Sequence, residues 1–332
     1  MSEALLRFDM MRAPFATASA GDLYRAAIEM SAWADRRKIG LVGLSEHHLG
    51  DGGFLASPFS MAAAVAARTE SISIGVAALL LNLYDPLHAA EEIVTLDLLS
   101  RGRISFTVGL GYREVEYQAF GADWAGRGKL LDENLRVLIG LLRGERVSTR
   151  GMAIHLATLP ESKLMGLVTL GGNSIRAAKR AGRLGLVFCP SVDDTELGQS
   201  YREESERCGN GTGFVVYPNA PSTTLIDEDP DRAWSLFGPF FEHHAKIYSG
   251  WAHPTRRAYA VPKGRTASEL RAEGKYRILT PEQAATALKE TGSLHLCPLT
   301  AGIDPALGWK TLELFESKVE CLLIDTPTDQ AI

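Results

Sequence analysis

The 332-residue sequence has only four cysteines, and no two of them lie close together. Cys189, Cys208, Cys297 and Cys321 are too far apart in the sequence for a CxxC redox pair or a zinc knuckle. We therefore expect reduced, partly buried thiols, which is the usual state of cysteine in a cytosolic protein.

The sequence also lacks an excess of basic residues, a long apolar run and a targeting segment. A net charge of −5 argues against a nucleic-acid surface, which needs clustered Lys and Arg. Residues 1–10 do not have the basic and apolar regions of a signal peptide. No apolar run reaches the roughly 18 residues that a membrane span needs. The expectation is a cytoplasmic protein with neither a nucleic acid nor a membrane as partner.

What the sequence does contain is typical of one large globular core. Hydrophobic residues make up 45% and charged residues 23% of the chain, which is an ordinary balance for a globular protein. The length alone suggests two domains, but α/β barrels commonly exceed 250 residues as a single domain. We therefore expect one domain over residues 1–332.

Short apolar runs alternate with longer helical patterns along the chain. This alternation is the signature of βαβ units and a parallel sheet, and eight such runs favour a (β/α)₈ barrel over an open sheet. The predicted strands are residues 5–9, 41–45, 71–79, 103–108, 167–170, 186–189, 213–217 and 294–297. The predicted helices are residues 23–37, 57–67, 85–99, 129–143, 173–183, 196–208, 234–248, 280–291 and 305–321.

Two further segments depart from this alternation. Residues 147–155 predict a small hairpin. Residues 249–276 have mixed charge, Pro262, Gly264 and little periodicity, so we interpret them as an inserted loop.

The working groups of a (β/α)₈ barrel lie at the carboxyl ends of its strands. After the fifth predicted strand come Gly171, Gly172, Asn173 and Ser174, which open a helix. The glycines let the backbone approach a ligand closely, and the N–H groups of a helix N-terminus bind phosphate. The alternative interpretation is a plain helix cap after a tight turn.

His47 and His48 follow the second predicted strand and are the candidate catalytic residues. Because they are adjacent, they face opposite ways on an extended strand end. A histidine at the barrel mouth would donate a hydrogen bond to an anion or move a proton near neutral pH. The alternative is a packed histidine. A metal site would have to join these residues to distant histidines, and no HxH or HExxH spacing supports one.

The segment from Asp97 to Arg103 leads into the fourth predicted strand at the opposite end of the barrel. It is charged and contains Gly102. Because that face of a barrel is remote from chemistry, we expect this turn to have a role in stability.

Taken in order, these motifs resemble the luciferase-like flavin-dependent monooxygenases. The resemblance is dense over residues 40–145, present again at 168–190 and 280–315, and absent at 195–275. Its residues are Glu46-His47-His48, Ser57-Pro58, Ile74-Gly75, Asp85-Pro86, residues 96–103 and 108–112, and Gly171-Gly172-Asn173-Ser174.

The resemblance implies a (β/α)₈ barrel that binds reduced FMN, or alternatively a reduced deazaflavin, at its mouth. The phosphate would lie near Gly172, Asn173 and Ser174, and the ring against Ala77 and Ala78, with a non-proline cis peptide between these two alanines. The active-site histidine of the family corresponds to His47, which would favour an anionic flavin peroxide by hydrogen bonding.

The turn Gly109-Leu110 would border the same cofactor. Luciferases carry a phosphate-binding arginine at the position of Leu110, and Arg113 is a possible substitute for it.

As partners, the family implies O₂, a small organic substrate, a separate flavin reductase and a second copy of the chain in a homodimer. Three other functions stay open at this point. They are deazaflavin-dependent hydride transfer, a non-catalytic flavin-binding subunit and, more distantly, a metallohydrolase. The substrate cannot be identified from the sequence, because residues 195–275 have no counterpart in the family.

Overall fold

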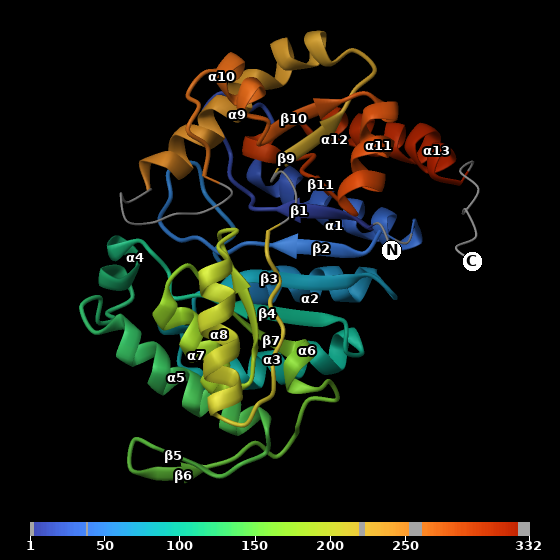
Figure 1. Ribbon diagram of the computed structural model, residues 1–332. Helices are drawn as coiled ribbons and strands as arrows, with labels where there is room; N and C mark the ends of the chain where they lie inside the picture. The colour runs from blue at the N-terminus through green and yellow to red at the C-terminus, as the bar shows by residue number, and fades with distance from the viewer. Residues whose placement is uncertain (1–2, 38, 219–222, 252–260, 325–332) are drawn as a thin grey trace. The chain divides into compact units, whose positions relative to one another are not determined.

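The computed structural model describes residues 3–37, 39–218, 223–251 and 261–324. Helices and strands alternate within these ranges (Figure 1). The backbone contacts divide the chain into two compact units. The first unit is Met1–Val42 with Asn219–Ala252 and Ala260–Ile332, and the second unit is Gly43–Pro218 with His253–Tyr259.

The first unit contains four parallel strands in the order β10-β9-β11-β1. Its apolar core lies between helix α9 and these strands, where Phe241, Tyr276 and Ile278 are buried. The strands are β1 (Glu3–Phe8), β9 (Thr223–Ile226), β10 (Tyr276–Leu279) and β11 (Ser293–Leu296). The helices are α1 (Ala20–Arg36), α9 (Pro230–Gly250), α10 (Ala267–Glu273), α11 (Pro281–Thr291), α12 (Pro305–Leu314) and α13 (Glu320–Ile324).

The second unit contains the parallel strands β3-β4-β7-β8 in that order, and β2 lies next to β3. A small antiparallel hairpin, β5–β6, confirms the one predicted from the sequence. The strands are β3 (Ser73–Leu79), β4 (Ile104–Val108), β5 (Val147–Thr149), β6 (Met152–Ile154), β7 (Val168–Gly172) and β8 (Val187–Pro190), together with the second half of β2 (Leu41–Leu44). The helices are α2 (Pro58–Arg68), α3 (Pro86–Ser100), α4 (Glu114–Ala119), α5 (Arg127–Leu142), α6 (Leu164–Leu167), α7 (Ile175–Leu184) and α8 (Thr195–Arg207).

Several helices begin with a polar residue followed by proline. Asp85 accepts hydrogen bonds from the first turn of α3, and Thr280 forms a capping box with Gln283 at the start of α11. Ser57 precedes α2, but its hydroxyl lies 2.9 Å from the hydroxyl of Ser60 rather than capping the helix. Proline is tolerated in the first turn of each of these helices, because a backbone N–H at that position would have no partner within the helix.

The predicted strand at residues 213–217 is wrong. This segment forms only an isolated bridge between Val215 and Phe188. Phe214 and Val216 are exposed, and Gly213 has a φ of 65°, so no buried alternating face develops. The sheet instead uses β9 and β10, two four-residue strands that the periodicity did not reveal.

The interpretation of residues 249–276 as an inserted loop is also wrong where the structure describes them. Helix α10 lies within this stretch, and Tyr276 begins β10. Thr266 and Glu269 form a capping box that starts the helix, and Gly274 ends it with a φ of 75°. These are ordinary helix signals, which the mixed charge of the stretch concealed. Residues 252–260 lie outside the described ranges.

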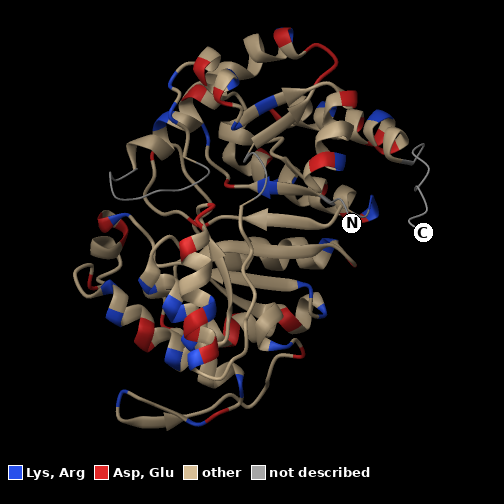
Figure 2. Cartoon of the chain, viewed as in Figure 1, with Lys and Arg blue, Asp and Glu red and all other residues tan. Residues whose placement is uncertain are grey.

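Acidic and basic side chains are interspersed on helices α5, α7 and α8 of the second unit (Figure 2). The guanidinium of Arg180 donates to both carboxylate oxygens of Asp132, at 2.6 and 3.2 Å. Arg183 and Arg207 both pair with Glu204. These ion pairs connect the three helices, and the mixture of signs gives no single basic face on them. Among the described residues, no helix is both long and apolar enough to cross a bilayer.

The turn from Asp97 to Arg103 is a dense hydrogen-bonded junction. Asp97 is fully buried, and its carboxylate accepts the N–H groups of Glu161 and Ser162 at 2.7 and 3.0 Å. The Arg103 guanidinium donates to the carbonyls of Ser100, Thr69, Ile72 and Ala66 and to the Thr69 hydroxyl. It therefore ties the start of β4 to the end of α2.

We expect Arg103→Met to lower the free energy of unfolding by about 2–4 kcal/mol, because these carbonyls lose a charged donor. Calorimetric melting of the purified variant measures the change. Arg25→Met is the control, since the Arg25–Asp22 pair is exposed and its removal should leave the melting temperature unchanged. Equal melting temperatures for the Arg103 variant and the wild type would contradict this role.

Candidate functional site

The carboxyl ends of β2, β3, β4 and β7 in the second unit carry most of the residues singled out from the sequence. Parallel strands end at one edge of a sheet, so the segments that follow them lie together (Figure 1). These segments contain His47 and His48, Ala77 and Ala78, Gly109 and Leu110, and residues 171–174.

Glu46 is the hub of this edge, and only 2% of its surface is exposed. One carboxylate oxygen accepts the backbone N–H of Leu80 at 2.7 Å. The other accepts the Tyr84 hydroxyl at 2.7 Å and lies 2.8 Å from Nε2 of His48. Burial, and then the negative charge of Glu46, raises the pKa of Tyr84, so its hydroxyl stays protonated and donates. Glu46 thereby joins the end of β2 to the end of β3.

The two adjacent histidines have different partners, as expected for neighbours on an extended segment. His47 Nε2 lies 2.9 Å from the hydroxyl of Tyr112, and its ring packs 5.1 Å from that of Phe54. His48 pairs with Glu46, and its ring packs 4.7 Å from Phe120. His48 is therefore held by a carboxylate, whereas His47 contacts a phenol that follows β4.

The peptide between Ala77 and Ala78 is cis, which confirms the prediction made from the sequence. Ala77 is exposed and Ala78 half-buried. A Cβ on Gly109 would lie 2.7 Å from the Cβ of Ala78, so only glycine fits at position 109. The next residue, Leu110, accepts a hydrogen bond from the Tyr117 hydroxyl through its carbonyl. The end of β3 therefore presents a small-residue surface that a flat ring can approach.

The segment after β7 forms a cradle of small residues. Ser174 caps α7 by accepting the N–H of Ala177 at 3.2 Å. A Cβ on Gly172 would lie 2.5 Å from the Cβ of Ala177, and one on Gly171 would lie 3.2 Å from the side chain of Thr107. Because the first N–H groups of a helix have no partner within it, this cradle suits a phosphate group.

Arg113 holds the loop that carries the histidines. Its guanidinium donates to the carbonyl of His48, to the carbonyl of Leu49 at 3.2 Å and to Glu116 Oε1 at 2.9 Å. Glu116 in turn accepts the N–H of His48 at 3.0 Å. Only 10% of the Arg113 side chain is exposed. Arg113 thus anchors this loop, and these bonds do not support it as the substitute phosphate ligand.

Sequence reasoning assigned no role to Glu46, Tyr84, Tyr112 or Glu116. Two signals in the sequence could have identified two of these residues. One is the carboxylate directly before two histidines, and the other is the spacing of three between Arg113 and Glu116 after a strand. Tyr84 had no such signal, because its bond to Glu46 joins residues 38 positions apart.

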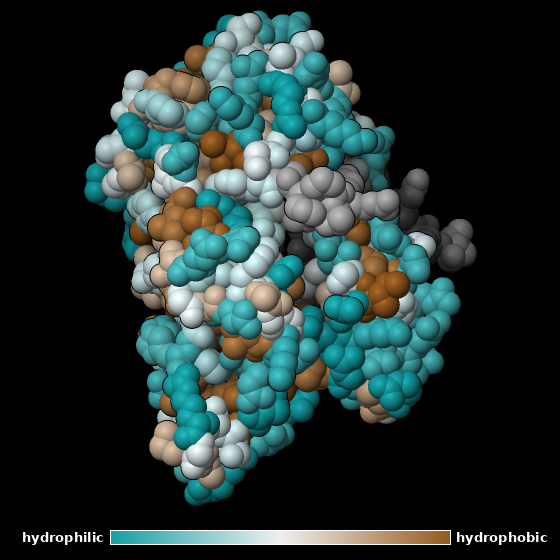
Figure 3. Space-filling view, turned by 90° about the vertical axis from the view of Figure 1, so that its left-hand side faces the viewer, coloured by the Kyte–Doolittle hydropathy of each residue, from teal (hydrophilic) through white to brown (hydrophobic). Residues whose placement is uncertain are grey.

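The face toward which the β2 arrow of Figure 1 points is the one seen in Figure 3. It is mostly hydrophilic and has separate hydrophobic patches. Exposed apolar side chains in the strand-end segments of the second unit include Leu49, Phe120 and Ile175. Among the described residues, no group of three or more His, Cys, Asp or Glu side chains is arranged to hold a metal ion.

Two of the relatives found by sequence illustrate the extent of the similarity. An uncharacterised protein of Sinorhizobium fredii is 33% identical over 66% of this chain and 66% of its own length. Limonene 1,2-monooxygenase of Rhodococcus erythropolis is 31% identical over 48% of this chain and 42% of its own. The matched regions thus span from less than half to about two thirds of these curated relatives.

Solved structures match over nearly the whole chain. Monooxygenase RslO1 of Streptomyces bottropensis is 21% identical, with a TM-score of 0.73 over 96% of this chain and 99% of that one. The oxygenating constituent of 3,6-diketocamphane monooxygenase of Pseudomonas putida, in complex with FMN, is 19% identical, with a TM-score of 0.65 over 96% and 98%. An F420-dependent secondary alcohol dehydrogenase is 16% identical, with a TM-score of 0.67 over 97% and 99%. These similarities confirm the (β/α)₈ fold class.

The family assignment comes from a model of the whole domain rather than from single motifs. The model described as luciferase-like monooxygenase matches residues 7–295, which include every strand-end segment described above. The chain therefore belongs to the luciferase-like monooxygenase family.

Proposed function

We propose that this protein is a monooxygenase that uses reduced FMN and O₂ to oxidise a small organic molecule. The observation that carries the proposal is that His47 and the Gly171–Ser174 cradle lie at the same carboxyl edge of the second unit. Family membership and the FMN complex of a related structure support it.

The residues of the cradle fit the phosphate of FMN. Gly172 leaves the space that a Cβ would fill, and Asn173 and Ser174 lead into the first turn of α7. Backbone N–H groups and the helix dipole favour an anion at this position without a cation. This is consistent with Leu110 in place of an arginine.

The ring would lie against Ala77 and Ala78, with Gly109 and Leu110 beside it. The two alanines offer a small apolar surface, and Gly109 lets the backbone after β4 approach Ala78. Bound reduced FMN would supply the electrons that activate O₂; the protein's part is to orient the reactants and exclude water.

His47 would act at Nε2, the nitrogen that lies beside the Tyr112 hydroxyl. A ring nitrogen there holds or donates a proton to developing negative charge on oxygen. His48 would act as a positioning residue, because Glu46 already holds its ring. The proposal also includes one domain over the whole chain, a cytoplasmic location, a homodimer and a separate reductase that supplies reduced FMN.

Reduced FMN should bind with a dissociation constant in the micromolar range, measured by anaerobic fluorescence titration. Gly172→Ala should weaken binding at least tenfold, because the new methyl group would collide with Ala177. Gly166→Ala is the matched control, since nothing lies within 4 Å of a Cβ at that position and its backbone is not left-handed. Equal affinity in the wild type and the Gly172 variant would remove the cradle from the site.

A second candidate is deazaflavin-dependent hydride transfer without oxygen. It is favoured by the similarity to a dehydrogenase solved with an F420–acetone adduct. The same anaerobic titration, repeated with reduced deazaflavin, separates the two functions. Tight binding of the deazaflavin with weak binding of reduced FMN would favour the second candidate.

His47→Ala should divert the reaction toward hydrogen peroxide, because negative charge on oxygen would lose its donor. With a reductase, FMN, O₂ and whichever small aldehyde or ketone gives turnover, the ratio of oxidised product to peroxide should fall at least tenfold. His88→Ala is the control, because His88 is an exposed residue of α3 whose recorded partner is Glu92. An unchanged ratio in the His47 variant would rule out this role.

A further inference from the structure

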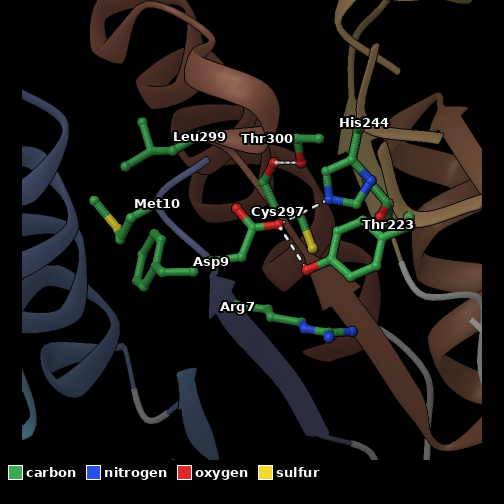
Figure 4. Close-up of a pocket in the computed structure, with 10 residues that line it drawn as sticks. Arg7, Asp9, Met10, Thr223, His244, Cys297, Leu299 and Thr300 are labelled. Atoms are coloured by element: carbon green, nitrogen blue, oxygen red, sulfur yellow. Dashed lines mark hydrogen bonds and ion pairs between the residues drawn. The ribbon is translucent and has the colours of Figure 1, made fainter. Parts of the chain in front are cut away.

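A second polar cluster lies wholly within the first unit, at the carboxyl ends of β1 and β11. It surrounds a cavity of about 40 Å³ (Figure 4). Arg7 and Asp9 come from β1 and the residue after it, His244 and Tyr248 from α9, and Cys297 from the end of β11. None of these residues was assigned a role by the sequence or by the proposed function.

The one carboxylate that lines this cavity, Asp9, is already engaged. Its oxygens accept the N–H of Met11 at 3.1 Å and lie 2.8 Å from Nε2 of His244. The other ring nitrogen of His244 lies 2.6 Å from the Tyr276 hydroxyl. Burial alone would raise the pKa of Asp9, but the bond to His244 and its charge lower the pKa below the ordinary value. Asp9 is therefore ionised and turned toward His244.

Arg7 has no such partner. Within the described residues, its guanidinium makes no hydrogen bond and no ion pair. Arginine cannot lose its proton in a protein, so it cannot escape the cost of burial by becoming neutral. A charged group in this position is stable when a ligand brings the opposite charge.

Against the effect of burial, the charge of Asp9 acts on Arg7 at longer range and helps to raise its pKa, but none of the described neighbouring groups pairs with the guanidinium directly. Burial raises the pKa of the Cys297 thiol to about 11 and also raises the pKa of Tyr276, so both are neutral at neutral pH. Burial and then the charges of Arg7 and Arg277 lower the pKa of His295 to about 4. Among these groups, two arginines, Arg7 and Arg277, therefore accompany one ionised carboxylate, Asp9.

We propose that this cavity binds the carboxylate of a small organic acid, with Arg7 as its charge partner. The planar fork of a guanidinium matches the two oxygens of a carboxylate. A volume of 40 Å³ exceeds the roughly 10–15 Å³ that one water needs, and a carboxylate group fits it. Met10 and Leu299 line the same cavity and provide apolar contact for the carbon chain. As a binding site within the first unit alone, the cavity goes beyond the proposed function and does not depend on it.

Acetate is the probe, followed by saturation-transfer NMR of its methyl group on the whole protein without flavin. The signal should saturate with acetate concentration, and acetamide, which has the same shape without the charge, should give none. Arg7→Met should weaken acetate binding at least tenfold. Arg12→Met is the matched control, because Arg12 of the same unit is held by the carbonyls of Ala16 and Ala18 and should not affect binding.

Thermal melting of Arg7→Met separates binding from a structural role. The melting temperature should change little, because the Asp9 carboxylate keeps His244 and the N–H of Met11 as its partners when Arg7 is removed. If this variant does not fold, Arg7→Lys keeps the charge without the fork and should bind acetate several-fold more weakly. Equal acetate binding in the Arg7 variants and the wild type, or equal signals from acetamide and acetate, would overturn the proposal. Because no flavin is present, either result leaves the FMN titration as a separate test of the proposed function.

Discussion

The candidate site of the second unit depends on the buried carboxylate of Glu46. It accepts a backbone N–H after β3 and the hydroxyl of Tyr84, and it fixes the ring of His48. A buried carboxylate is stable only when hydrogen-bond donors replace the water that it loses. Loss of any one of the three contacts would therefore destabilise the other two. Since His48 is fixed, its neighbour His47 is directed to the opposite side, toward Tyr112. The position of the proposed proton donor therefore follows from a residue that need not touch the ligand.

Small side chains are the second constraint on this edge. A Cβ added to Gly109 would collide with Ala78, and a Cβ added to Gly172 would collide with Ala177. Both pairs join the end of one element to its neighbour. Backbone N–H groups at a helix N-terminus point toward a bound anion and also attract it by their partial positive charge. This explains how the edge suits a phosphate although Arg113 is used to hold a loop.

Local signals in the sequence were enough for most elements and for the main chain of the site. Asp85-Pro86 and Thr280-Pro281 start helices, and Gly171 to Ser174 lead into a capped helix. The cis peptide between Ala77 and Ala78 was expected from the family resemblance instead. The strands β9 and β10 escaped because four residues are too few to establish a period, and all four of β9 are buried. Contacts such as Tyr84 to Glu46 were also out of reach, since they depend on which strand ends become neighbours.

The polar cluster of the first unit was even harder to predict from the sequence, because it joins Asp9 to a histidine 235 residues away. A sequence with one arginine and one aspartate two residues apart on a strand suggests an internal ion pair. Residues i and i+2 do face the same side of a strand, but Asp9 follows the strand and binds His244 and the N–H of Met11 instead. Once the carboxylate is directed to the imidazole, the guanidinium of Arg7 forms no ion pair with it, and the charge of Asp9 acts on Arg7 only at longer range. Because Asp9 binds His244 and not Arg7, the Arg7 guanidinium is suited to bind an anionic ligand.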